Sequence, residues 1–200
     1  GLTLGFQIEH LGTPGGATLA QAYSELVAKA RVDVVLIVET PLGALRVADT
    51  AAVDNTVGVM WGAEDLFGSL GGTANRFADG SYRDVAVHVR SQSLLAAKAH
   101  GKLALDSVYI DIKNLDGLRT EVDDAVAVGF DIKVALHPSQ VTVIRDGYRP
   151  TVEQVAWAKR VLDAAVTNRG AFALDGTTES AERRVQRDRA IQFVDGDKDG

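Results

Sequence analysis

Two acidic residues, Glu39 and Asp65, each follow a short apolar run. This pattern is typical of a buried strand that is followed by a carboxylate at the edge of its sheet. The runs are Val34–Val38 and Val57–Trp61, each too short for a helix and bounded by turn residues. Neighbouring parallel strands lie about 4.8 Å apart, and ligands of α/β folds bind at that edge. Carboxylates so close repel each other unless a cation or a shared proton intervenes. The spacing predicts a divalent metal site, with surface or salt-bridged carboxylates as the alternative.

The elements that position this pair form a strand, helix, strand unit. Asp33–Val38 reads as the first strand, and Gly43–Val53 has apolar residues at helical spacing before the second strand. The remaining expected elements are a strand over 2–8, a helix over 17–30, a glycine-rich loop from Asp65 through Gly80, a helix over 84–100, a strand over 105–112, a helix over 116–128 that Gly129 ends, a strand over 130–136 and a helix over 151–166 with Thr151 as N-cap.

Repeated strand and helix segments predict an α/β fold with a parallel sheet covered by helices. A closed eight-stranded barrel takes about 250 residues, so four good strands make half of one. We expect one domain over residues 1–176, of which 1–32 are atypical, and a charged tail over 177–200.

Composition narrows the classes of function. The 200 residues are 46% hydrophobic and carry a formal charge of -6, which supports a globular fold and argues against nucleic acid as a partner. The absence of cysteine excludes disulfides and thiolate chemistry and is compatible with the cytoplasm. No apolar stretch approaches the roughly 20 residues that cross a bilayer, so we expect a soluble, cytoplasmic protein without a membrane partner.

Several strings within residues 33–175 together carry a resemblance to a known family. The most specific of them is Gly62-Ala63-Glu64-Asp65-Leu66. The others are Val38-Glu39-Thr40, Met60-Trp61, Leu70-Gly71-Gly72, Ala78-Asp79-Gly80-Ser81-Tyr82-Arg83-Asp84, Ala104-Leu105-Asp106-Ser107-Val108-Tyr109 and His137-Pro138-Ser139-Gln140. By these strings the chain resembles the citrate lyase beta-subunit-like family of the aldolase and acyl-CoA lyase superfamily.

The resemblance implies a TIM (β/α)8-barrel type fold, of which this chain represents the C-terminal half plus flanking segments. It also implies that Glu39 and Asp65 bind Mg²⁺ and contact the substrate, and that the backbone around Gly62 and Ala63 receives a substrate carboxylate. The implied activity is carbon-carbon bond cleavage of a citramalyl-, malyl- or citryl-CoA thioester into acetyl-CoA and a keto acid. The implied partners are therefore acyl-CoA and keto-acid small molecules.

The chain also departs from the family pattern. The family has an arginine that grips the substrate and a further acidic strand end before the matching part, and an aspartate after it that reaches a neighbouring subunit's site; Asp175 does not match that aspartate well. The alternative is therefore a truncated or degenerate, non-catalytic homologue that serves as a binding or assembly subunit. A keto-acid aldolase that works without CoA is a third hypothesis.

A half barrel leaves two unpaired sheet edges, which favour association. The sequence therefore predicts a homo-oligomer, a swapped barrel or a replacement strand from residues 1–16.

Five other polar residues have both a functional and a structural interpretation. Glu64 is interpreted as a helix-start carboxylate, Asp111 as a loop cap or an assisting acid, and His137 as a packed strand-end histidine or a proton carrier. Arg76 and Arg83 are solvated loop residues or contacts for a CoA phosphate.

Three further features are interpreted as structural. Trp61 and Trp157 fit core packing. Residues 195–200 match the opening of an EF-hand loop but lack its bidentate glutamate, so they read as a solvated acidic end. Residues 179–189 could form an exposed helix whose charges face water.

Overall fold

The computed structural model describes residues 4–5, 33–167, 171–174 and 177–180. The chain divides into two compact units, residues 1–144 and 145–200. This division differs from the predicted boundary after residue 176. An antiparallel hairpin of β6 (Ala171–Leu174) and β7 (Thr177–Ser180) joins residues on both sides of that boundary.

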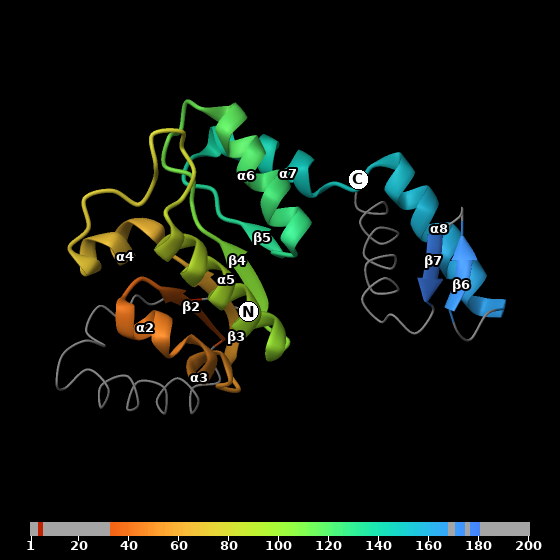
Figure 1. Cartoon of the computed structure of the whole chain (residues 1–200), viewed down its shortest axis with the longest axis horizontal. Helices are drawn as coiled ribbons and strands as arrows, with labels where there is room; N and C mark the ends of the chain where they lie inside the picture. The colour runs from red at the N-terminus through yellow and green to blue at the C-terminus, as the bar shows by residue number, and fades with distance from the viewer. Residues whose placement is uncertain (1–3, 6–32, 168–170, 175–176, 181–200) are drawn as a thin grey trace. The chain divides into compact units, whose positions relative to one another are not determined.

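The first unit contains a parallel sheet of five strands in chain order; Figure 1 labels β2 to β5 of this sheet. The strands are β1 (Leu4–Gly5), β2 (Val34–Val38), β3 (Thr56–Trp61), β4 (Leu103–Asp106) and β5 (Ile132–Lys133). Helices connect β2 to β5, which confirms the predicted α/β alternation. The short β1 pairs with the edge of β2 and occupies the place predicted for a replacement strand.

The helices of the described part alternate with these strands and continue into the second unit. They are α2 (Pro41–Leu45), α3 (Val47–Ala51), α4 (Ala63–Leu70), α5 (Asp84–Ala99), α6 (Leu115–Val128), the 3-10 turn η1 (Pro138–Gln140), α7 (Val141–Tyr148) and α8 (Val152–Thr167). None of the helices in the described ranges has both the length and the apolar content needed to span a bilayer.

Local end signals predicted several of these bounds correctly. α6 ends where Gly129 takes the left-handed conformation with φ 103°, which glycine adopts without a side-chain clash. α8 begins after Thr151, whose hydroxyl accepts a hydrogen bond from the Gln154 amide at 3.2 Å. The helix predicted over 84–100 is α5.

Other predicted elements were wrong. The strand predicted over 105–112 is β4, which ends at Asp106 because its ladder with β5 ends there, and an irregular segment follows. The loop predicted after Asp65 begins instead as α4, which has Glu64 and Asp65 in its first turn and ends at Gly71 with φ 71°. The helix over 43–53 is divided at Arg46, and the strand over 130–136 shortens to β5.

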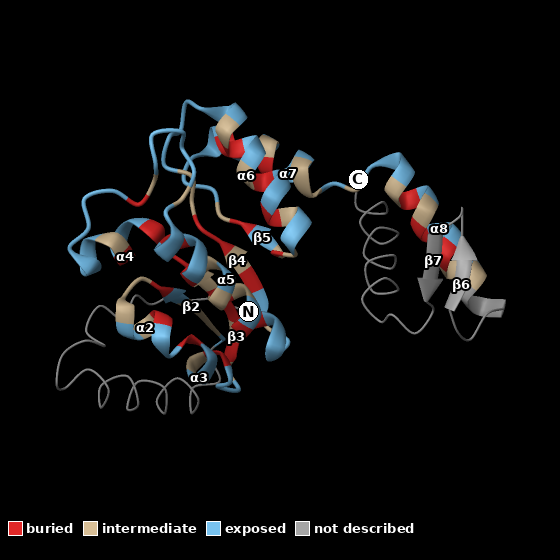
Figure 2. Cartoon of the chain, viewed as in Figure 1, coloured by how far each residue is buried: buried red, intermediate tan, exposed pale blue. Residues whose placement is uncertain are grey.

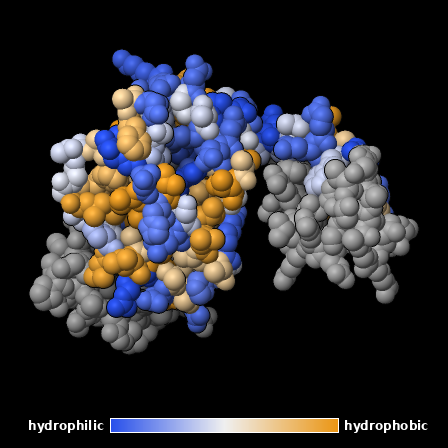
Figure 3. All heavy atoms as spheres, viewed as in Figure 1, coloured by the Kyte–Doolittle hydropathy of each residue, from blue (hydrophilic) through white to orange (hydrophobic). Residues whose placement is uncertain are grey.

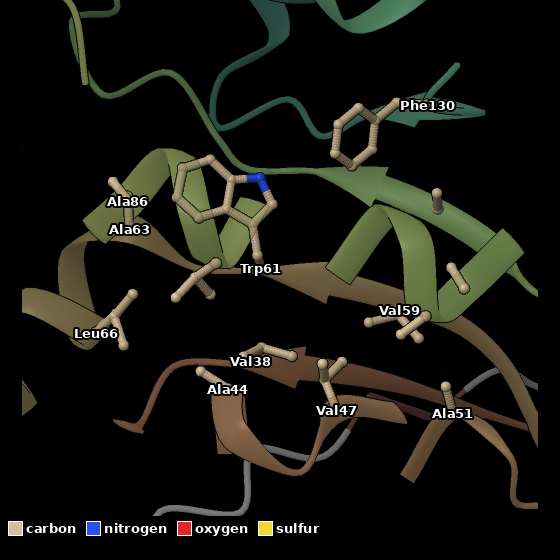
Figure 4. Packing of buried hydrophobic residues seen from close by; sticks show 14 of the residues in the cluster. Val38, Ala44, Val47, Ala51, Val59, Trp61, Ala63, Leu66, Ala86 and Phe130 are labelled. Carbon is tan, nitrogen blue, oxygen red and sulfur yellow. The ribbon is translucent and has the colours of Figure 1, made fainter. Parts of the chain in front are cut away.

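The core lies between one face of the sheet and the helices packed against it (Figure 2). Alternate strand residues point to that face, including Val38, Val59, Trp61 and Ala104, all of them buried. Figure 4 shows Trp61 among these side chains, with Ala63 and Leu66 of α4 close by. The end of β3 is therefore anchored in the core immediately before the candidate site.

The opposite face carries an apolar row of Ile37, Met60, Leu105 and Ile132, which are partners across the four strands. Ile37 and Ile132 are 37% and 39% exposed. Orange patches on the face shown in Figure 3 also mark apolar surface on this unit. One side of the sheet is thus well covered and the other is less so.

Some predicted segments lie outside the described residues. They are the helix over 17–30, the acidic end at 195–200 and most of the exposed helix over 179–189; the first two residues of that last segment belong to β7.

Candidate functional site

Glu39 lies beside Gly62 at the carboxyl edge of the sheet. Val38 and Trp61 are partners in the β2–β3 ladder, and the Gly62 amide donates to the Val38 carbonyl at 3.0 Å. The Glu39 side chain fills the space at Gly62: a Cβ there would lie 2.6 Å from Glu39 Oε1 and 2.7 Å from its Cγ. The predicted meeting of the two strand ends is therefore present.

Asp65 lies in the first turn of α4, which begins directly after Gly62. Its carboxylate is exposed, whereas Glu39 is half-buried. Glu39 thus directly follows β2, and Asp65 lies in the helix that follows the adjacent strand β3. Glu64, in the same turn, is the helix-start carboxylate that the sequence predicted, and it also accepts a hydrogen bond from Asn75 Nδ2 at 2.6 Å.

The backbone around Gly62 forms the N-terminus of a helix, whose first amides can bind a ligand. Gly62 is the N-cap of α4 and has no side chain to cap the helix. The first amides of a helix have no intrahelical partners, and together with the helix dipole they favour an anion. Because the Gly62 amide is used by Val38, such amides begin at Ala63.

The donors at this edge suit a hard cation. Within the described residues there is no group of three or more histidine, cysteine, aspartate or glutamate side chains arranged for a metal. A cation held by Glu39 and Asp65 would have two protein carboxylates as ligands, with the remaining positions left to water and substrate oxygens. Mg²⁺ is bound in this way in many proteins, by one or two carboxylates.

A buried ion cluster lies against the core side of the same edge, with Asp106 at its centre. The Asp106 carboxylate, 1% exposed, accepts from Trp61 Nε1 at 2.7 Å, from Arg90 at 2.9 and 3.2 Å, and from Lys133 Nζ at 3.0 Å. Burial works to raise the pKa of Asp106, but Lys133, Arg90 and Trp61 together hold that pKa below its ordinary value. Asp106 is therefore ionised and fully engaged.

The cluster extends to the loop over residues 71–83. Arg76 forms an ion pair with Glu121 at 2.5 Å and lies 3.6 Å over the ring of Tyr82. Burial works to lower the pKa of Arg76, but its hydrogen bond to Glu121 raises that pKa above the ordinary value. Arg76 is committed to these partners, which argues against a solvated residue. Arg83 lies 4.6 Å over the ring of Phe77.

The two other candidates have structural roles in this structure. His137 is exposed and caps η1, with its Nδ1 accepting from the Ser139 amide at 3.2 Å. Asp111 accepts from the Lys113 amide at 3.3 Å, as a loop cap does. Trp61 is fully buried as predicted, and Trp157 is half-buried.

Sequence reasoning missed the roles of Asp106, Lys133 and Gln140. Gln140 is fully buried, and its Nε2 donates to the Tyr109 carbonyl at 2.8 Å. A usable signal existed for the charged pair: Asp106 shares the strand period of buried Ala104, and period-two alternation places both on the core face. Charges on a core face require partners.

Comparison with known proteins gives a consistent picture. The profile of the HpcH/HpaI aldolase/citrate lyase family matches residues 7–138. The matched range includes residues 7–32, which lie within the segment that the sequence analysis interprets as atypical.

Relatives and solved structures agree with that profile. A citrate lyase subunit beta-like protein of Mycobacterium tuberculosis is 55% identical over 157 residues, which are 78% of this chain and 58% of the relative. The mitochondrial citramalyl-CoA lyase of Rattus norvegicus is 33% identical over 153 residues, 70% of this chain and 44% of the relative. A crystal structure of CitE from Mycobacterium tuberculosis, in complex with magnesium, acetoacetate and coenzyme A, has a TM-score of 0.76 at 45% identity, covering 92% of this chain and 75% of that one.

The chain thus spans between about two fifths and three fifths of the length of these two relatives, 44% and 58%.

Proposed function

Because the chain belongs to the HpcH/HpaI aldolase/citrate lyase family, we propose that it is a Mg²⁺-dependent carbon-carbon lyase acting on a hydroxyacyl-CoA thioester. Citramalyl-, malyl- and citryl-CoA are the candidate substrates, and acetyl-CoA and a keto acid the products. The observation that carries the proposal is the packing of Glu39 against Gly62, at the strand end from which α4 carries Asp65.

In this proposal Glu39 and Asp65 hold the cation through their carboxylate oxygens. The first free amides of α4, beginning at Ala63, hold the substrate carboxylate and orient the carbon-carbon bond that breaks. The cation supplies Lewis acidity that favours loss of the proton from the substrate hydroxyl. The half-buried Glu39 is restrained by its packing against Gly62.

The fold and assembly are part of the same proposal. The parallel sheet of this chain is part of a (β/α)8 barrel, and the chain associates with itself as a homo-oligomer. The partly exposed apolar row of Ile37, Met60, Leu105 and Ile132 supports this, because apolar sheet faces and sheet edges favour association.

The activity test incubates the chain with each of the three thioesters, with and without Mg²⁺, and measures acetyl-CoA by chromatography. We expect turnover that needs Mg²⁺ and that falls by more than about 100-fold in Glu39→Ala and Asp65→Ala. Asp123→Ala, which breaks an exposed pair with Arg119 on α6, is the matched control and should keep the activity.

Turnover that survives loss of both acids would refute the metal assignment. Binding of Mg²⁺ without turnover of any thioester would refute the lyase and support the alternative, a binding or assembly subunit. Cleavage of a free hydroxy-keto acid in place of the thioesters would identify an aldolase that works without CoA.

A further inference from the structure

We propose that Asp106 is a positioning residue for the turn of residues 62–65, acting through the indole N–H of Trp61. The inference rests on the proposed function, since this turn carries the proposed metal ligand Asp65. Asp106 is 1% exposed and its carboxylate is fully used by protein donors. It therefore acts through its neighbours.

The connection begins at the end of β3. Trp61 is fully buried and is the last residue of the strand, so its backbone leads directly into Gly62. The indole Nε1 donates to Asp106 Oδ1 at 2.7 Å. Rotation of the indole would break a charge-assisted hydrogen bond and bury an unpaired donor. The strand end is thus held in one orientation.

Asp106 is itself held from several elements. Arg90 of α5 donates with Nε to one carboxylate oxygen at 2.9 Å and with Nη2 to the other at 3.2 Å. Lys133 of β5 donates to the second oxygen at 3.0 Å. A carboxylate fixed by a forked guanidinium and an ammonium has little freedom to turn. Through Asp106, α5 and β5 therefore restrain the orientation of the Trp61 indole.

A second route reaches the turn from the loop over residues 71–83. The rings of Trp61 and Tyr82 meet edge to face with their centroids 5.1 Å apart. Arg76 covers the Tyr82 ring at 3.6 Å and pairs with Glu121 at 2.5 Å. Glu121 in turn accepts from Lys133 at 2.9 Å, so these contacts form a closed circuit through Asp106.

The loop over residues 71–83, which carries Arg76 and Tyr82, also contacts the turn of residues 62–65 directly. Asn75, which precedes Arg76, donates to Glu64 at 2.6 Å, and Glu64 is adjacent to Asp65. The turn is therefore held before its start by Trp61 and within it by Glu64. Loss of the Trp61 to Asp106 hydrogen bond should loosen this turn selectively, whereas a purely structural role would loosen the whole unit.

The test compares Trp61→Phe and Asp106→Asn with the wild type in two measurements. Amide hydrogen exchange of residues 62–66 is measured without metal, and Mg²⁺ affinity is measured by titration calorimetry. We expect exchange in 62–66 to become about 10-fold faster or more while α3, which contributes no residue to the ion cluster, is unchanged, and the Mg²⁺ dissociation constant to rise about 10-fold.

Two control variants accompany them. Lys98→Ala removes a surface pair with Asp131 at 2.6 Å. Tyr82→Phe keeps the ring contacts and removes a buried hydroxyl that has no hydrogen-bond partner among the described residues. Both should show wild-type exchange in residues 62–66.

Folded Trp61→Phe that exchanges like the wild type in 62–66 would overturn the inference, and so would uniformly faster exchange throughout the unit. If Asp106→Asn fails to fold, Trp61→Phe still decides the question. If the wild type binds no Mg²⁺, the proposed function fails, while the exchange measurement still decides the role of Asp106.

Discussion

At the level of single residues, Gly62 is the position where side-chain size sets the geometry of the candidate site. Its Cα faces the Glu39 side chain so closely that a Cβ would lie 2.6 Å from Oε1 and 3.1 Å from the carboxylate carbon. Only glycine leaves this space to Glu39. The position of the Glu39 side chain, the proposed metal ligand, therefore depends on the absence of a side chain at residue 62.

Gly62→Ala should displace the Glu39 carboxylate and weaken Mg²⁺ binding by about 10-fold or more. Overpacking of this kind should also lower the free energy of unfolding by about 1–3 kcal/mol. Titration calorimetry and urea unfolding measure the two effects. Gly68→Ala, at a position with nothing within 4 Å of an added Cβ, is the control; wild-type affinity in Gly62→Ala would contradict the proposed role of Glu39.

At the level of elements, the helix ends are set by glycines whose backbone is left-handed. Gly129 ends α6 with φ 103°, and Gly71 ends α4 with φ 71°. The interior of α4 contains Gly68, whose position is helical and exposed. Glycine therefore stabilises the helix ends at Gly71 and Gly129, whereas at Gly68 it weakens α4.

Gly129→Ala should lower the free energy of unfolding by about 1–2 kcal/mol, because an L side chain is strained in that conformation. Gly68→Ala should raise it by about 0.5–1 kcal/mol, because alanine favours the helical state. Urea titration followed by circular dichroism measures both. If both variants changed the free energy of unfolding in the same direction, the backbone angle φ would not be what decides the effect of replacing glycine.

At the level of the whole molecule, the ion cluster around the buried Asp106 couples the free energy of unfolding to pH. It joins β3, β4, β5, α5, α6 and the loop over residues 71–83 through three carboxylates, Asp106, Glu121 and Asp124, and three cations, Arg76, Arg90 and Lys133. The native pKa of Asp106 lies below its ordinary value of 3.8. The unfolded chain therefore takes up this proton more readily than the folded chain.

The stability that Asp106 contributes should be complete above pH 3.8 and should be lost as the pH falls from there through the lowered native pKa. Urea unfolding of the wild type between about pH 2 and pH 7 should show this acid loss. In Asp106→Asn, the slope below pH 3.8 should be shallower. Equal slopes in both proteins would show that other carboxylates carry the acid sensitivity.

Much of the local structure could be predicted from the sequence. The short apolar runs before Glu39 and Asp65 identified β2 and β3, and the Gly129 and Thr151 signals identified helix ends. The prediction for the segment after Asp65 was wrong because its glycines suggested a loop, whereas the acidic first turn and the buried Leu66 favour a helix.

The sequence by itself determined the α/β alternation and the two strands that precede Glu39 and Asp65, because both follow from patterns within a few residues. Only the tertiary structure decided where β4 ends and what Asp106 does. Its partners Trp61 and Lys133 lie 45 and 27 residues away in the chain. A buried charge is stable only where such distant donors converge, and no local pattern specifies that convergence.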